Sequence, residues 1–316
     1  MKEKVLITGF NGEIGSKILQ ELVKRGKSII ALDITDAKEE IASVKYIKDS
    51  ILNFKLINHL FENNNITEVY HFAALLSQTA YKNPELANET NEKASKNLID
   101  SAYSHGINNG DMTRFFFPSS IAVYGPRKID NASEQDIIKP TTVYGNNKLI
   151  IEQYGSRIHE ESISKNIGLD FRSIRFPGVI SYDTVPSGGT TDYAPQMIDC
   201  AKSNRLFECK LSPETTLPFI GIDKTVLSII DMMNLDRIDS KLRAFNVEEV
   251  NFSVKQLKDF LLTKFPSFKI TFKEDKNFQS VADSWPSSLN CSRANKYLNF
   301  QSEQSFESFV ENILNR

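Results

Sequence analysis

The chain has 316 residues, of which 40% are hydrophobic and 25% charged, and its formal net charge is -2. These are ordinary values for a globular protein, and such a small net charge gives no reason to expect binding to nucleic acid or to an anionic membrane. Because this length exceeds the size at which a single core usually stops growing, we expect a large α/β domain with a smaller companion.

Cysteine and histidine spacing predicts no metal site. Cys200, Cys209 and Cys291 match neither a zinc site nor a disulfide framework, and the four histidines lack ligand-like spacing. No segment approaches the run of about 20 apolar residues that spans a bilayer. The apolar stretch that ends at Gly9 is too short for a secretory signal. A cytoplasmic location is therefore expected.

The chain begins with a strand, a glycine turn and a helix. Residues 5–8 form a continuous apolar run, typical of a strand buried on both faces of a parallel sheet. Residues 16–25 carry apolar side chains at helical spacing. The sequence GFNGEIG between them lets backbone N–H groups approach a pyrophosphate closely. The predicted cofactor contacts in this turn are Gly9, Phe10, Asn11, Gly12, Glu13, Ile14 and Gly15.

The second strand leads into an acidic residue. Residues 28–32 are apolar and are followed by Asp33, which lies 18 positions after Gly15. A carboxylate at this distance accepts hydrogen bonds from an adenosine ribose and repels a 2′-phosphate. NAD is therefore predicted over NADP, although Lys38 weakens this preference.

Two further strands bring more candidate cofactor contacts. Residues 44–47 precede Asp49, which could meet the adenine or cap the helix that follows. Residues 69–72 form a fourth strand and lead into Ala73 and Ala74, whose small side chains suit backbone running beneath a dinucleotide. A helix over about residues 91–104 comes next.

The fifth strand, residues 114–118, is followed by a hydroxyl that faces the crevice where ligands bind, that of Ser120. Further on, Tyr144 and Lys148 lie at i and i+4, which places a phenol and an ammonium on one helix face. A fixed cation lowers the pKa of a nearby tyrosine towards the working range of a general base. Together the three side chains form a candidate catalytic set.

The alternation of strands and helices predicts a doubly wound parallel sheet. A sixth strand is expected over residues 169–176, and the segment 187–195, rich in small and hydroxyl residues, begins the second domain or forms a flexible loop. Later short strands are predicted near residues 207–211, 245–247 and 269–272, and helices near 146–163, 223–234, 253–265 and 304–315.

With GFNGEIG, Asp33, HFAA, PSSIAVYG and YGNNK in order, the chain resembles the extended short-chain dehydrogenase/reductase superfamily. The segments KNPELA, RSIRFPGVISY, GGTTDYA and DSWP are similar to its threonine-oxidising members. The resemblance implies that Ser120, Tyr144 and Lys148 are catalytic, with Ser119 as the second choice for the serine, and that NAD is the cofactor. It also implies that the amino-acid pocket includes Ser77, Thr190, Thr191 and Trp285.

The resemblance implies a Rossmann-type NAD-binding domain over residues 1–177, rejoined by about 218–248. Residues 178–217 and 249–316 would form the smaller α/β substrate-binding domain. By family analogy a homodimer is expected, with the helices near 91–104 and 146–163 at the contact. The single tryptophan, Trp285, also fits a core or interface anchor.

The leading hypothesis is NAD-dependent oxidation of the 3-hydroxyl of L-threonine to 2-amino-3-oxobutyrate, with Tyr144 as the general base. The alternative is an NAD-retaining nucleotide-sugar 4-epimerase or dehydratase that uses the same catalytic residues. That activity needs a cationic clamp for the diphosphate, for which Arg205 and Arg293 are candidates. A non-catalytic NAD-sensing protein is the third hypothesis, and the intact catalytic set argues against it.

Overall fold

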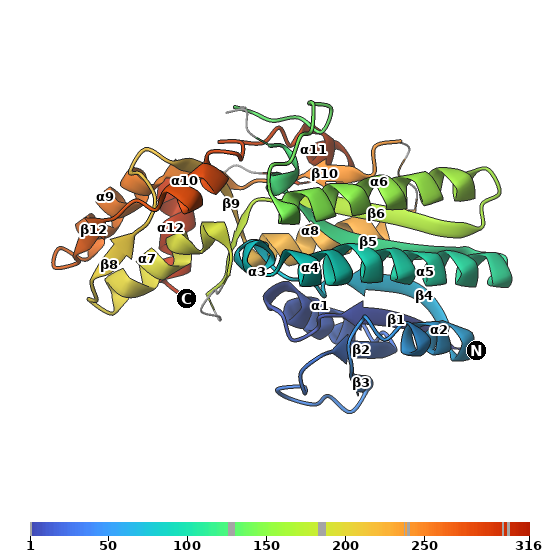
Figure 1. Cartoon of the computed structure of the whole chain (residues 1–316). Helices are drawn as coiled ribbons and strands as arrows, with labels where there is room; N and C mark the ends of the chain where they lie inside the picture. The colour runs from blue at the N-terminus through green and yellow to red at the C-terminus, as the bar shows by residue number, and fades with distance from the viewer. Residues whose placement is uncertain are drawn as a thin grey trace.

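The computed structural model describes residues 2–125, 130–182, 188–236, 238, 241–298, 300–301 and 304–316. Within these residues the largest sheet has seven parallel strands in the order β10-β6-β5-β4-β1-β2-β3 (Figure 1). The strands are β1 Glu3–Thr8, β2 Ile29–Asp33, β3 Val44–Lys48, β4 Asn65–His71, β5 Met112–Ser120, β6 Gly168–Phe176 and β10 Ala244–Asn246. The predicted α/β class with a doubly wound parallel sheet is confirmed.

Side chains of successive strand residues enter two separate cores, one on each face of this sheet. In β1, Val5 and Ile7 belong to one core and Leu6 to the other, because side chains alternate along a strand. Three helices pack on the first face: α1 (Glu13–Lys24), α8 (Ile222–Asn234) and α11 (Ser292–Leu298). Three pack on the second: α2 (Phe54–Asn63), α5 (Ser95–Asn109) and α6 (Val143–Ile163). Burial on both faces explains the apolar runs within β1, β2 and β5.

A smaller lobe lies beside the carboxyl ends of these strands (Figure 1). It contains a sheet in the order β11-β9-β7 and the pair β12-β8. Its strands are β7 Gly178–Ile180, β8 Phe207–Cys209, β9 Thr216–Gly221, β11 Val250–Ser253 and β12 Ile270–Phe272. Its helices are η3 Thr190–Asp192, α7 Tyr193–Lys202, α9 Val254–Lys264, α10 Lys276–Ala282 and α12 Phe306–Leu314. We call this part the small lobe.

Short helices connect β4 to α5 and β5 to α6. They are α3 Ser77–Lys82, α4 Pro84–Ala87, the π-helical turns η1 Asn88–Ala94 and the 3₁₀ turn η2 Ile121–Val123. In η1 the buried side chain of Asn91 accepts a hydrogen bond from Leu75 N at 2.7 Å and donates one to Leu75 O at 2.9 Å. The loop that leaves β4 is therefore fixed in place by a helix further along the chain.

The structure corrects several predicted boundaries and adds elements. β4 begins at Asn65 instead of residue 69, and β5 begins at Met112 instead of residue 114. The helices α3, α10 and α11 and the sheet β11-β9-β7 were not predicted, because each is short and gains its stability from tertiary contacts. Among the described residues, no helix combines the length and the apolar composition needed to cross a bilayer.

Candidate active site

A cavity of about 300 Å³ opens at the carboxyl ends of the parallel strands. It lies where β1 has β2 on one side and β4 on the other, which is the switch point at which ligands bind in doubly wound sheets. Loops after β1, β4, β5 and β6 form its inner wall. Residues 189–192 and Trp285 close it from the side of the small lobe.

The glycine turn after β1 is shaped for close approach of a ligand. Gly9 has φ of +71°, and a Cβ there would lie 2.5 Å from the backbone nitrogen of Ala73. A Cβ on Gly15 would lie 2.2 Å from Gly9 O, so the first turn of α1 packs directly on the loop. No side chain among the described residues caps the amino end of α1 at Gly12. Its N–H groups therefore face the cavity as an anion-binding site that suits a dinucleotide pyrophosphate.

Asp33, at the end of β2, stands beside this turn. Its carboxylate accepts hydrogen bonds from Asn11 N at 3.1 Å and from Thr35 N at 3.0 Å. The amide of Asn11 donates to Thr35 Oγ1 at 2.7 Å, which fixes both loops. The Asp49 carboxylate instead accepts from Ser50 N at 2.7 Å and Asn53 Nδ2 at 2.9 Å. Of the two predicted positions, Asp33 therefore fits a ribose contact better, whereas Asp49 supports the start of α2.

The last three residues of β5 each meet a different residue on one face of α6. Pro118 O accepts a hydrogen bond from Lys148 Nζ at 2.6 Å, and the Ser119 hydroxyl donates to Glu152. The Ser120 hydroxyl lies close enough to the phenol of Tyr144 to lower its pKa, and it accepts a hydrogen bond from Ala122 N at 3.2 Å. Tyr144, Lys148 and Glu152 are spaced four apart along the helix, so they share one face. Since Ser119 is engaged by Glu152, Ser120 is the serine beside the phenol.

The pKa values of Tyr144 and Lys148 differ from those expected from the sequence. Burial raises the pKa of Tyr144 to about 12, and the neighbouring Ser120 hydroxyl lowers it only partly. Burial also lowers the pKa of Lys148 to about 7, against the opposing charge of Glu152. The pKa of Tyr144 is therefore raised where the sequence predicted a lowered value, because desolvation opposes both charged forms. The phenol needs a protonated cation beside it to act as a base.

His71 is a structural residue at the end of β4. Its Nδ1 lies 2.6 Å from Thr8 Oγ1 and its Nε2 lies 2.8 Å from Ser95 Oγ. Burial, with the nearby charge of Lys148, lowers its pKa to about 3. The imidazole therefore stays neutral and acts as a packed link between β1 and α5.

Hydroxyl groups line the outer wall of the cavity. Ser77 Oγ and Thr190 Oγ1 lie 3.4 Å apart, and Gln78 holds the two segments together by donating to Gly188 O and Gly189 O. The Asp192 carboxylate accepts from Gly189 N at 2.7 Å and so fixes the turn that carries the threonines. Ser187, in the predicted glycine-threonine segment, lies outside the described residues.

Trp285 belongs both to the small-lobe core and to the cavity wall. Its side chain is buried, and its indole Nε1 has no hydrogen-bond partner among the described residues. A buried donor without a partner is costly, so a ligand that accepts a hydrogen bond there would be favoured. The two interpretations of this tryptophan, core anchor and pocket residue, are thus compatible.

Most predicted site residues meet at this one cavity. Its lining includes Gly9, Gly12, Glu13, Ile14, Gly15, Ala74, Ser77, Ser119, Ser120, Tyr144, Lys148, Thr190, Thr191 and Trp285. Five predicted contacts lie outside the lining: Phe10, Asn11, Asp33, Asp49 and Ala73. Phe10 is buried against Tyr46 with ring centroids 5.2 Å apart, so its side chain supports the turn from behind.

Sequence reasoning missed several lining residues. They are Phe72, Leu76, Pro118, Ile121, Phe176, Pro177, Val179, Gly189 and Asp192. Pro177 follows the sixth predicted strand, so its position at a carboxyl strand end was a usable signal. Asp192 lies inside the GGTTDYA segment and could have been found in the same way. Phe176 and Leu76 carried no signal, because apolar residues next to a strand or loop are usually core.

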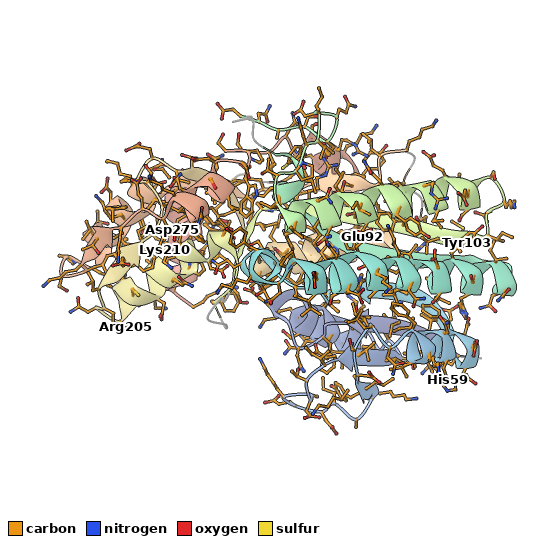
Figure 2. The ribbon with its side chains drawn as sticks, in the orientation of Figure 1. His59, Glu92, Tyr103, Arg205, Lys210 and Asp275 are labelled. Atoms are coloured by element: carbon orange, nitrogen blue, oxygen red, sulfur yellow. The ribbon has the colours of Figure 1, made fainter. Side chains whose placement is uncertain are left out.

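The two arginines considered as a diphosphate clamp lie elsewhere. Arg205 is exposed and pairs with Asp199 at the outer end of the small lobe (Figure 2). Arg293 donates to Ala244 O at 2.9 Å and stacks on the ring of Phe245. Over the described part of the chain, Lys148 is the one lysine or arginine in the lining of this cavity. Within the described residues, no three His, Cys, Asp or Glu side chains are grouped to hold a metal ion.

Comparison with known proteins agrees with this geometry. The sequence model of the NAD dependent epimerase/dehydratase family matches residues 5–223. A protein of Bos taurus named "L-threonine 3-dehydrogenase, mitochondrial" is 34% identical over 99% of this chain and 82% of its own length. A Staphylococcus haemolyticus protein named as an uncharacterized epimerase/dehydratase is 29% identical over 99% of this chain and 96% of its own. The solved structure of L-threonine dehydrogenase from Phytophthora infestans superposes with a TM-score of 0.88 at 28% identity, covering 99% of this chain and 98% of that one.

Proposed function

The chain belongs to the NAD dependent epimerase/dehydratase family and is an NAD-dependent dehydrogenase, and from this premise we propose that it oxidises the 3-hydroxyl of L-threonine to 2-amino-3-oxobutyrate. The observation that carries the proposal is the single cavity in which the glycine turn, the Ser120, Tyr144 and Lys148 set and a hydroxyl-rich wall meet. Similarity to threonine dehydrogenases over nearly the whole chain supports the choice of substrate.

The side chains divide the proton chemistry between them. Tyr144 accepts the proton of the 3-hydroxyl, and Ser120 donates a hydrogen bond to the same oxygen and orients it. Lys148 supplies positive charge next to the phenol; its Nζ lies 5.5 Å from the centroid of the Tyr144 ring. Because the pKa of Tyr144 is raised by burial, this charge is needed to stabilise the phenolate.

The residues present fit NAD. When bound, NAD supplies the acceptor for the hydride that leaves C3 of the substrate. In the proposal, the N–H groups of the glycine turn hold the pyrophosphate, Asp33 accepts hydrogen bonds from the ribose, and Ala73 and Ala74 lie beneath the dinucleotide. Asp49 and the side chains of Phe10 and Asn11 contribute indirectly, by fixing these loops.

The polar wall suits the head group of an amino acid. The hydroxyls of Ser77, Thr190 and Thr191 can donate to a carboxylate and accept from an ammonium, since each hydroxyl does both. The indole N–H of Trp285 is a further donor without a partner among the described residues. A small zwitterion can satisfy these groups without an arginine clamp.

A nucleotide-sugar epimerase or dehydratase is the second candidate, and one observation favours it. A neighbouring cavity of about 250 Å³ shares Ser77, Tyr144 and Thr190 with the first and is also lined by Lys82 and Lys210. Lys210 lies in the small lobe near Asp275 (Figure 2). These lysines could receive an anionic group of a larger substrate. Among the residues that the structure describes, no arginine lines either cavity, which favours the amino acid.

The test is the absorbance of NADH formed from NAD and four substrates: L-threonine, L-serine, L-allo-threonine and UDP-galactose. We expect NADH to accumulate with L-threonine and kcat/KM to be highest for it. Conversion of the UDP-sugar without net NADH, together with no turnover of threonine, would establish the epimerase instead. A cytoplasmic location stays a prediction, to be checked by cell fractionation.

A further inference from the structure

A buried carboxylate lies one helical turn beyond the catalytic lysine. Glu152 is 5% exposed and follows Lys148 on the same face of α6. It accepts a hydrogen bond from the hydroxyl of Ser119. Ser119 stands between Pro118, which contacts Lys148, and Ser120, which lies beside Tyr144. The mechanism above assigns no role to this carboxylate, although a buried charge is costly unless it is paired.

The partner of this carboxylate is Arg175 on β6. Arg175 is 3% exposed and donates to Glu152 through Nε at 3.0 Å and Nη2 at 2.8 Å. It also donates to Tyr124 OH at 3.0 Å, and that hydroxyl donates to Asn246 Oδ1 at 2.7 Å. Ser119 and Arg175 are register partners in adjacent strands, so the pair joins β5, β6 and α6 beneath the reacting groups.

Few other charges act on Lys148. On its own helix it faces Tyr144 and Glu152, and from β4 it faces the neutral His71. On β5 its Nζ meets Pro118 O and lies over the ring of Phe117, 4.6 Å from the centroid. The cation of Arg175 lies behind Glu152. Among the described residues, Glu152 is the carboxylate whose charge acts on the pKa of Lys148, and it opposes the effect of burial on the lysine.

We propose that Glu152 is a positioning residue of the reaction: it fixes the end of β5 through Ser119 and places the negative charge that keeps Lys148 protonated. The proposal rests on the proposed role of Lys148 in stabilising the phenolate. Arg175 holds the carboxylate in place through two hydrogen bonds. In this arrangement the lysine charge is set by a residue that touches neither substrate nor cofactor.

The direct test measures the protonation of Lys148 without substrate. Protein labelled with ¹³C at the lysine Cε position is titrated by NMR, and the Lys148 signal is assigned with the Lys148→Met variant. Removing a negative charge disfavours the ammonium, so Glu152→Gln should lower the titration midpoint of Lys148 by about one pH unit or more. An unchanged midpoint in the folded variant would overturn the proposal.

Two further variants separate charge from structure. Glu134→Gln changes a buried carboxylate at the other end of the same network, where Glu134 accepts from Asn246 N at 2.9 Å. We expect it to leave the Lys148 midpoint unchanged, and an equal shift there would contradict the assignment to Glu152. If Glu152→Gln does not fold, the double variant Glu152→Gln/Arg175→Met removes the pair together, without leaving an unpaired arginine. Its midpoint should fall in the same direction by a smaller amount, and no fall would overturn the proposal.

A kinetic readout links the shift to turnover. The alkaline limb of the kcat profile should move to lower pH by the same amount as the NMR midpoint, with KM for the substrate little changed. Kinetic and NMR shifts that disagree in direction would contradict the positioning role. A shift of the NMR midpoint in a protein that does not oxidise threonine would leave the charge assignment intact and reject the proposed function.

Discussion

Tyr144 and Lys148 have pKa values displaced in ways that make each less charged at neutral pH. The pKa of the phenol is raised to about 12 and that of the ammonium is lowered to about 7, and burial is the main cause of both shifts. The proton therefore rests on the tyrosine unless positive charge is brought near it. Because the pKa of Lys148 lies close to the working pH, modest changes in surrounding charge decide how much of it is protonated.

For the single residue Tyr144, we predict the effect of the substitution Tyr144→Phe. The change removes the proton acceptor but keeps the ring, so kcat should fall by about 100-fold or more, in the range of lost general-base catalysis. The Kd for NADH, measured by the quenching of Trp285 fluorescence, should stay within about threefold of the wild-type value, since the cofactor turn is untouched. The matched control is Tyr193→Phe, because the Tyr193 hydroxyl is buried without a partner among the described residues. If Tyr144→Phe turned over as fast as the control, Tyr144 would not be the general base.

Helix α6 and the end of β5 act as one element of the site. Pro118, Ser119 and Ser120 engage Lys148, Glu152 and Tyr144, so a shift of the helix by a fraction of a turn would separate these pairs. The helix begins at Val143, with Thr142 as its cap: the Thr142 hydroxyl accepts from Gly145 N at 3.0 Å. Close contact between α6 and η2 sets the depth of the helix in the molecule.

Gly145 makes that close contact, so we predict the effect of Gly145→Ala. A Cβ there would lie 2.2 Å from Ala122 O, which forces α6 away from η2 despite the better helix propensity of alanine. We expect a loss of about 1–3 kcal/mol in the free energy of unfolding, typical of overpacking, and a lower kcat. Denaturant unfolding and NADH formation measure the two effects. The exposed neighbour offers a control, because Asn146→Ala should keep or raise stability without changing kcat. Equal stability of the two variants would show that the contact is not tight.

At the scale of the molecule, two lobes enclose the site from different sides. The large sheet supplies the glycine turn and the catalytic helix, and the small lobe supplies Thr190 and Trp285. Hydrogen bonds from Gln78 to Gly188 and Gly189 tie the lobes at the cavity. In the proposed function, substrate binding between the lobes would give the second lobe control over substrate choice, while the chemistry would stay on the first.

The homodimer stays a prediction, and the face at which we expect the contact is polar. The outer sides of α5 and α6 and of the adjoining η1 are polar: Lys96 pairs with Glu92 at 2.7 Å and Arg157 with Glu161 at 2.6 Å. We expect a dimer through this face to weaken in salt, because exposed ion pairs are screened at about 1 M ionic strength. Light scattering at low and high salt measures the mass. A dimer that persists unchanged in high salt would point to a different, more apolar face.

Features carried by contiguous residues were predictable from the sequence. The apolar run of β1, the glycine turn, Asp33 and the Tyr144 to Lys148 spacing each express a local rule of strand, turn or helix geometry. The order of these segments was enough to predict the fold class and most of the residues that line the cavity. Apart from β9, the strands of the small lobe carried weaker patterns, because three or four residues are too few to show a period.

Only the tertiary structure decided questions that depend on burial and on distant partners. It engaged Ser119 with Glu152 and left Ser120 beside the phenol, although both hydroxyls end the same strand. It reversed the expected direction of the Tyr144 pKa, since desolvation depends on everything packed around the ring. It also paired Glu152 with Arg175, which lies 23 residues further along the chain. The sequence by itself determined which groups are present, and folding determined which of them meet and how much water they lose.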